Sequence, residues 1–156
     1  MSSTNTAGAS AAGDQYLTFA VDGCEYGLEI LRVQEIKGYS RVTPIPRTPP
    51  HVKGVLNLRG TIVPVIDLRA RFALPEIEHT RFSVVIVLTV GTRVIGLLVD
   101  AVSDVLTVGA ADRGAVPDLG GTVDTAFVAG MAKSGERLVT LLDVDRLVGG
   151  DAALAG

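Results

Sequence analysis

Residues 52–72 read VKGVLNLRGTIVPVIDLRARF, and this stretch decides the fold. Apolar runs stand on both sides of one polar turn, in which Gly60 supplies the positive φ that a tight turn needs. The run 62–66 is short and rich in β-branched residues, which favours a strand over a helix. The stretch therefore predicts a β-hairpin with Arg59 at its tip. Pro64 cannot donate to a strand ladder, so we expect it on an edge strand or at a bulge.

Further short strands are predicted on both sides of this hairpin. The dipeptide Asp22-Gly23 is typical of a hairpin turn, and it separates two segments of alternating apolar and polar residues. One helical turn is expected to begin at Pro49-Pro50 and to end at Gly54. The predicted strands are 15–21, 25–30, 33–36, 81–90 and 94–100.

The second half of the chain repeats the first. Residues 26–28 and 33–36 align with 95–97 and 102–105 at a shift of 69, and the aspartates at 67 and 143 align at a shift of 76. Two similar units of about 65 residues, each with four or five short strands, indicate a duplicated small β-barrel.

The two copies differ at one turn. Asn57-Leu58-Arg59-Gly60 in the first copy corresponds to Lys133-Ser134-Gly135-Glu136 in the second, which reads as an ordinary solvated turn. A turn needed only for folding should tolerate similar residues in both copies. The contrast therefore favours a functional role for Arg59 over a merely solvated charge.

The composition excludes several classes of function. The 156 residues carry a net charge of −3, without a basic block, so the electrostatic footprint of a nucleic-acid-binding protein is missing. No apolar run is long enough to span a bilayer, and residues 1–13 lack the features of a secretory signal, so we expect a cytoplasmic protein without direct membrane insertion. A single domain at 15–148 is predicted, with a disordered tail at 1–14 and a flexible tail at 149–156.

Candidate catalytic and metal-binding residues are few. His51 and His79 lie in connectors, and their spacing to other ligand types does not suggest a metal site, so no metal or cofactor is predicted. Asp67 and Asp143 occupy equivalent positions and could form a carboxylate pair for acid–base catalysis. Each also fits the N-cap of a short helix, which is the favoured interpretation. A small β-barrel enzyme and a ligand-binding barrel stay open as alternatives to a protein-binding role.

Several motifs, in this order and spacing, resemble the CheW family, the coupling proteins of bacterial chemotaxis. The resemblance runs from about Tyr16 to Val148. It implies an all-β fold of two five-stranded SH3-like barrels packed together, with short helical turns. The two subdomain halves would be roughly 15–80 and 81–148, with exchange of strands possible between them. The motifs are EYGLEI at 25–30, VQEIKGY at 33–39, VKGVLNLRG at 52–60, IVPVIDLR at 62–69, VVIVL at 84–88 and VDAVSDVL at 99–106.

The resemblance also implies a function. Proteins of this family are non-catalytic adaptors without cofactors, which bridge the cytoplasmic tip of methyl-accepting chemoreceptors to the regulatory domain of the histidine kinase CheA in membrane-associated arrays. A receptor helix lies in the groove between the two barrels. The positions associated with receptor docking match Val33, Glu35, Arg59, Val84 and Val105 here, whereas the kinase-binding residues are not assigned.

Overall fold

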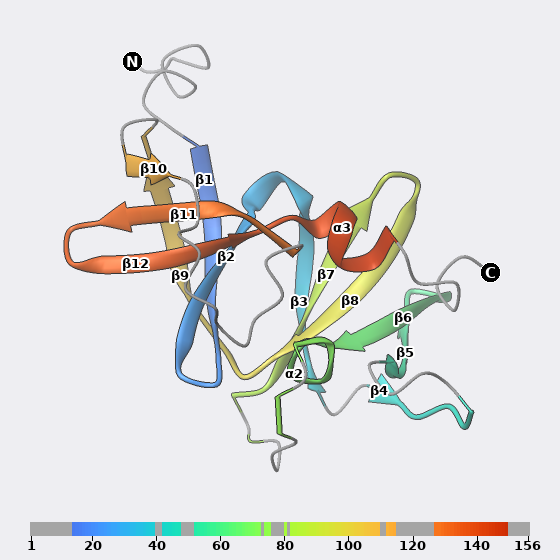
Figure 1. The fold of residues 1–156 in the computed structure, drawn as a ribbon. Helices are drawn as coiled ribbons and strands as arrows, with labels where there is room; N and C mark the ends of the chain where they lie inside the picture. The colour runs from blue at the N-terminus through green and yellow to red at the C-terminus, as the bar shows by residue number, and fades with distance from the viewer. Residues whose placement is uncertain are drawn as a thin grey trace.

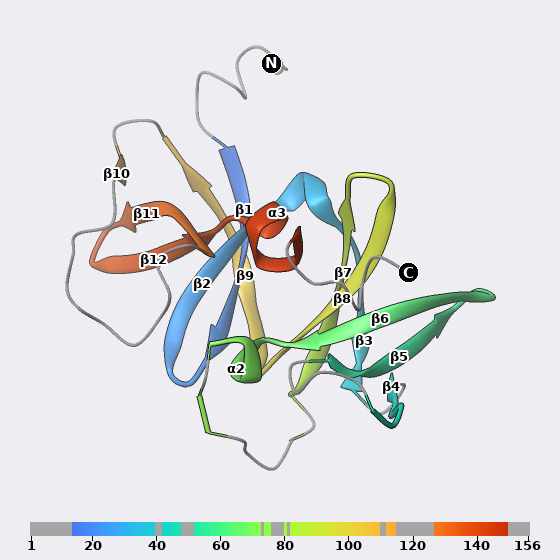
Figure 2. The same ribbon diagram turned by 45° about the vertical axis from the view of Figure 1, so that its right-hand side comes forward.

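The structure is a computed structural model that describes residues 14–39, 42–47, 52–72, 74–75, 80, 82–109, 112–114 and 127–149. Most of these residues lie in strands, which form two curled six-stranded sheets (Figures 1 and 2). Of the predicted N-terminal tail at 1–14, residues 1–13 lie outside the described residues, whereas Asp14 is the first residue of a strand. Nearly all of the predicted C-terminal tail and both histidines also lie outside the described residues.

The first sheet has the strand order β10-β11-β12-β2-β1-β9. Asp22 and Gly23 both have positive φ, at 54° and 77°, which confirms the hairpin turn predicted between β1 and β2. The helix α3 (Val144–Gly149) follows the last strand. The strands are β1 (Asp14–Val21), β2 (Cys24–Glu29), β9 (Ala101–Val108), β10 (Arg113–Gly114), β11 (Val128–Ser134) and β12 (Arg137–Leu142).

The second sheet has the order β3-β7-β8-β6-β5-β4. A 3-10 turn, η1 (Ile30–Arg32), leads from β2 into β3, and the short helix α2 (Leu68–Arg71) follows β6. The prediction of an all-β fold with short helical turns is confirmed. Each sheet has six strands, because a two-residue strand, β4 or β10, is added at one edge. The strands are β3 (Val33–Gly38), β4 (Val42–Thr43), β5 (Val52–Leu58), β6 (Thr61–Asp67), β7 (Val84–Val90) and β8 (Arg93–Val99).

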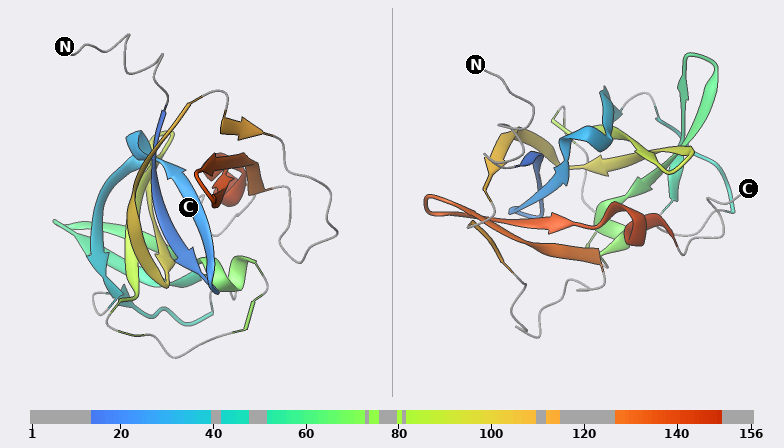
Figure 3. Two further views of the ribbon diagram at one scale, coloured as in Figure 1. Left: turned by 90° about the vertical axis from the view of Figure 1, so that its left-hand side faces the viewer. Right: turned by 90° about the horizontal axis from the view of Figure 1, so that it is seen from above.

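The sequence repeat is also a structural repeat. β12 runs parallel to β2 with Leu141 opposite Gly27, and β6 runs parallel to β8 with Val65 opposite Gly96. These two pairs are equivalent under the shifts of 76 and 69 residues. The equivalent hairpins β5–β6 and β11–β12 project on opposite sides of the molecule (Figures 1 and 3).

Each sheet combines strands from both copies. The hairpin β1–β2 pairs with β9 and β12 of the second copy, whereas the hairpin β7–β8 pairs with β3 and β6 of the first. The chain crosses between the sheets at η1 and again at Asp100, between β8 and β9. The two halves of the sequence are therefore interlocked.

The main hydrophobic core contains residues of both sheets and of both short helices. Three ring contacts connect it, between Phe19 and Tyr26 at 6.0 Å, Tyr26 and Phe72 at 5.3 Å, and Phe72 and Phe127 at 6.3 Å between ring centroids. Burial of one large apolar side chain is worth about 1.5–3 kcal/mol, so this shared core holds the sheets together. Fully buried members include Leu28, Ile66, Leu68, Ile86, Leu88, Leu97 and Leu147.

Two predictions about the β5–β6 hairpin were wrong. No helical turn ends at Gly54, because β5 begins at Val52, and a Cβ atom at Gly54 would lie 2.2 Å from the carbonyl oxygen of Thr43 on β4. Pro64 is neither on an edge strand nor at a bulge, since β6 lies between β5 and β8 and Pro64 pairs regularly with Val55, the register shift of this ladder falling between Val52 and Gly54. Pro64 lies one residue before the pairing with β8 begins and at a position whose nitrogen points away from β5, so it interrupts neither ladder.

Candidate protein-interaction site

The β5–β6 hairpin presents Arg59 at its tip. Arg59 and Gly60 have φ values of 50° and 90°, typical of a type I′ turn, and the Asn57 side-chain oxygen accepts a hydrogen bond from the Gly60 N–H at 2.9 Å. A left-handed backbone costs a residue other than glycine about 1–2 kcal/mol. The equivalent position of the second copy is Gly135, with φ at 62°. The chain thus keeps an arginine where its own repeat has glycine, which indicates a role for the side chain.

Glu35 on β3 binds this arginine. Nη2 of Arg59 lies 2.8 Å from Oε2 of Glu35, and Nζ of Lys37 lies 3.2 Å from Oε1. The hydrogen bond from Arg59, followed by that from Lys37, lowers the pKa of Glu35, so the carboxylate is charged at neutral pH. The Arg59 side chain remains 70% exposed. The cluster is therefore a surface feature with one excess positive charge.

The three valines predicted to take part in docking lie at different places. Val33 and Val84 are half-buried on the neighbouring strands β3 and β7, where Val33 is opposite Leu88 and Val84 is opposite Gly38. Val105 is 48% exposed on β9, at an edge of the other sheet. The structure thus brings Glu35 into contact with Arg59 and places Val33 and Val84 on adjacent strands of the same sheet. Val105 lies apart from them, on the other sheet.

The second copy contains an equivalent ion pair that the sequence comparison missed. Asp104 aligns with Glu35, and its two carboxylate oxygens accept hydrogen bonds from Arg137 at 3.0 and 3.1 Å. Arg137 stands two positions beyond the residue that aligns with Arg59, so matching residues one by one did not reveal it. The contrast between the two hairpin tips is therefore smaller than predicted.

The two arginines differ in their surroundings. Arg137 is only 36% exposed, and it also donates to Glu25 at 2.7 and 3.1 Å. Because Glu25 lies on β2 and Asp104 on β9, Arg137 links β12 to both strands and closes the curled first sheet. Arg59 is twice as exposed, and it shares its one carboxylate with Lys37. Exposed ion pairs contribute little to stability, which leaves Arg59 available to a partner.

Asp67 and Asp143 both cap helices, as predicted. A carboxylate oxygen of Asp67 accepts a hydrogen bond from the Arg69 N–H at 3.1 Å, and one of Asp143 accepts from the Arg146 N–H at 3.2 Å. These bonds satisfy donors at the starts of α2 and α3. Both carboxylates are thus engaged in capping, and no group of metal ligands occurs within the described ranges.

A buried ion cluster at α2 was not anticipated from the sequence. The guanidinium of Arg69, which is 7% exposed, donates to both carboxylate oxygens of Asp100 at 2.8–3.2 Å and to the carbonyl oxygen of Pro75 at 3.0 Å. Asp100 also accepts from the Asp22 N–H at 2.9 Å. The cluster therefore fastens the β1–β2 turn and the β8–β9 crossover to α2.

A similar contact occurs at the second helix with the charges exchanged. Asp145 on α3 aligns with Arg69, and it accepts two hydrogen bonds, at 3.0 and 3.2 Å, from Arg32 in the β2–β3 crossover. In both places an ion pair between the two copies therefore joins a helix to a crossover, but the positive group is on the helix at α2 and on the crossover at α3.

Residues 15–151 match the family model of the CheW-like domain. The chain belongs to the CheW family. It is 46% identical over 136 residues to the chemotaxis protein CheW of Klebsiella aerogenes, covering 87% of this chain and 82% of the relative. With the chemotaxis protein CheW of Rhizobium meliloti it shares 39% identity over 133 residues, which are 85% of this chain and 86% of that one.

A crystal structure of a CheW protein has the same fold. The scaffolding protein TtCheW from Thermoanaerobacter tengcongensis superposes with a TM-score of 0.81 at 33% identity, covering 89% of this chain and 96% of that one. Membership of the CheW family makes this protein a non-catalytic chemotaxis adaptor, as the sequence predicted. Within the described residues, no helix has the length and hydropathy to cross a bilayer.

Proposed function

We propose that this adaptor couples transmembrane chemoreceptors to the histidine kinase CheA and so lets the receptor control kinase activity. The observation that carries the proposal is Arg59, an exposed arginine held in a left-handed conformation and paired with Glu35 at 2.8 Å. Its own repeat has glycine at that position. An adaptor needs such recognition groups, whereas an enzyme needs a cluster of reactive side chains.

The receptor tip is proposed to dock on Val33, Glu35, Arg59, Val84 and Val105. A helix binds a groove through an apolar stripe, and charged groups at the rim fix its direction and register. The valines would supply apolar contact, and the Glu35–Arg59 pair would supply the oriented charges. Because Val105 lies on the first sheet and the other four residues belong to the second, the proposed docking surface spans both sheets.

The regulatory domain of CheA would bind a different face, so that receptor and kinase can be held together. Coupling then requires that the two receptor states contact the adaptor differently, since a ligand shifts an equilibrium only by its differential affinity for the two states. The same proposal implies a cytoplasmic protein that is recruited to receptor arrays at the membrane.

A reconstitution with purified components tests this function. The adaptor, a signalling fragment of a chemoreceptor and CheA are mixed, and kinase autophosphorylation is measured for the full mixture and for each mixture that lacks one component. Receptor control of the kinase should require all three proteins. Kinase activity that is indifferent to the adaptor, with every CheA and receptor of the source organism, would contradict the proposal and favour a ligand-binding barrel.

A further inference from the structure

The two edge strands that carry the proposed receptor surface are entered in the same way. β3, with Val33 and Glu35, directly follows the crossover η1, and β9, with Val105, directly follows the crossover at Asp100. An edge strand pairs with one neighbour only, so its position depends strongly on the segment that leads into it. Because each crossover is tied to a helix by an ion pair, these pairs are placed where they can control both edge strands.

β3 also has a β-bulge at its start. Val33 is opposite Leu88 and Glu35 is opposite Val87, so Gln34 is an extra residue in the ladder with β7. The ladder of β9 with β1 shifts its register at the position that the repeat predicts, 69 residues later. A slip by one residue turns the side chains of a strand to its opposite face, so the register at the bulge decides where Val33 and Glu35 point.

The turn η1 has little of its own to fix this register. It is three residues long, none of them is fully buried, and its N-cap residue Glu29 forms no side-chain capping bond. Ile30 packs against the main core while only partly buried, and Leu31 is 94% exposed. The conformation of the crossover therefore depends on its third residue, Arg32.

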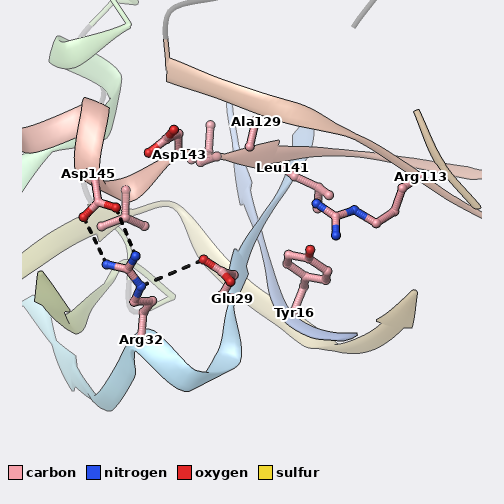
Figure 4. A pocket seen from close by; sticks show the side chains of 10 residues that line it. Tyr16, Glu29, Arg32, Arg113, Ala129, Leu141, Asp143 and Asp145 are labelled. Atoms are coloured by element: carbon pink, nitrogen blue, oxygen red, sulfur yellow. Dashed lines mark hydrogen bonds and ion pairs between the residues drawn. The ribbon is translucent and has the colours of Figure 1, made fainter. Parts of the chain in front are cut away.

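Arg32 ties the crossover to α3 (Figure 4). Its Nη1 and Nη2 atoms lie 3.2 and 3.0 Å from the two carboxylate oxygens of Asp145, whereas its contact with Glu29 is longer, at 3.9 Å. The hydrogen bonding from Arg32 lowers the pKa of Asp145, so this carboxylate is charged at neutral pH. Two parallel hydrogen bonds fix the orientation of a guanidinium as well as its distance. The ion pair thus holds the chain one residue before Val33.

The helix at the other end of this ion pair is firmly placed. Val144 and Leu147 of α3 are buried in the main hydrophobic core. The carbonyl oxygen of Leu147 accepts a hydrogen bond from Nε of Arg71 on α2 at 3.1 Å, and Asp143 caps the start of the helix. Since α3 is anchored independently of η1, the ion pair transmits the position of the helix to the crossover.

We propose that Arg32 and Asp145 are positioning residues for the receptor surface. Their ion pair fixes the start of β3 in the register that presents Val33 and Glu35 to the receptor helix, and neither partner of the pair touches the receptor itself. The inference rests on the proposed function, because it concerns the surface that is proposed to bind the receptor.

Affinity for a receptor signalling fragment, measured by calorimetry, tests the proposal. Arg32→Gln and Asp145→Asn should each bind about two- to fivefold more weakly than wild type, because an exposed ion pair can order the free surface only to that extent. Arg146→Gln removes an exposed arginine of the same helix that lies outside the pair and should bind like wild type. Wild-type affinity in both ion-pair variants would overturn the proposal.

Reversing the charges separates positioning from direct contact. Arg32→Glu and Asp145→Lys should each weaken receptor binding, and the double variant, which restores an ion pair with the opposite polarity, should bind better than either single variant. If Arg32 touched the receptor directly, the double variant would bind no better than Arg32→Glu, and the positioning role would be wrong.

Amide chemical shifts of the free chain test the positioning without a receptor. Asp145→Asn should shift the amides of Val33 and Glu35, which are distant from residue 145 in sequence, and should leave the far end of β3 unchanged. Shifts confined to α3 and η1 would overturn the proposal. If wild type does not bind the receptor fragment at all, the proposed function fails, and these amides still decide whether the ion pair positions β3.

Discussion

The guanidinium of Arg59 binds the carboxylate of Glu35 at 2.8 Å, and this contact joins the tip of the β5–β6 hairpin to the edge strand β3. Arg59 is exposed and has an unfavourable backbone conformation, so the pair is a poor device for stability. In the equivalent pair, Arg137 binds a second carboxylate, that of Glu25, as well as Asp104, and so closes the first sheet. The Arg137 pair is therefore a structural contact, whereas the exposed Arg59 pair is accessible to a partner.

Replacing Arg59 by glycine should separate function from stability. Glycine removes the guanidinium but adopts the positive φ freely, which recovers about 1 kcal/mol of backbone strain. We expect a free energy of unfolding equal to or above that of wild type, together with weaker receptor binding. Urea denaturation and binding of a receptor fragment check the two halves. A marked loss of stability would show that the ion pair holds the hairpin in place.

The two charge-exchanged ion pairs should differ in their contribution to stability. Arg69→Met leaves Asp100 without its main partner in a largely buried site and should cost about 3 kcal/mol. Arg32→Met breaks the equivalent pair, in which Asp145 is 61% exposed, and should cost less than about 1 kcal/mol. Denaturant unfolding of both variants checks the order. Equal losses would mean that burial does not decide the strength of these pairs.

The equivalent glycines Gly27 and Gly96 should tolerate alanine to different degrees. A Cβ atom at Gly96 would lie 2.6 Å from Cγ1 of Val85, whereas one at Gly27 would lie 3.1 Å from Cδ2 of Leu141. Overpacking should therefore make Gly96→Ala lose about 1–3 kcal/mol, and Gly27→Ala less. Thermal melts of the two variants decide this, and a larger loss at Gly27 would contradict the closer packing of Val85 against Gly96.

The Glu35 carboxyl should titrate below its usual pKa of 4.5, because the hydrogen bonds from Arg59 and Lys37 favour its charged form. Since the pKa is lower in the folded state, the pair's stabilisation is present above pH 4.5 and is lost as the pH falls through the folded value. A carbon-detected NMR titration measures the midpoint. Arg59→Gly should raise it toward 4.5, and a wild-type midpoint at or above 4.5 would mean that the pair does not form in solution.

Local features of the fold were predictable from the sequence. The turns at Asp22-Gly23 and Arg59-Gly60 and the caps at Asp67 and Asp143 depend on residues within a few positions of one another, and each occurs as predicted. The exchange of strands depends instead on parallel pairs such as Val65 with Gly96, which are distant in sequence and have no local signal.

Ion pairs between distant elements escaped sequence reasoning for a related reason. Arg69 and Asp100 are 31 positions apart, and nothing in either segment marks the other as its partner. The pair of Arg137 with Asp104 was hidden by a displacement of two residues between the copies. Arg59 was singled out by the contrast between the two hairpin turns and Glu35 by the family resemblance, but their contact and the participation of Lys37 required the structure.

Receptor binding by Arg59→Glu tests the central claim most directly. The charge reversal places a second carboxylate beside Glu35 and removes the exposed positive charge, while Arg146→Glu reverses an arginine of similar exposure, 67%, on α3. Affinity for a receptor signalling fragment is measured by calorimetry for both variants and for wild type, and melts confirm folding. Coupling through this surface predicts binding at least about tenfold weaker for Arg59→Glu and unchanged for Arg146→Glu. Wild-type affinity in a folded Arg59→Glu variant would contradict it.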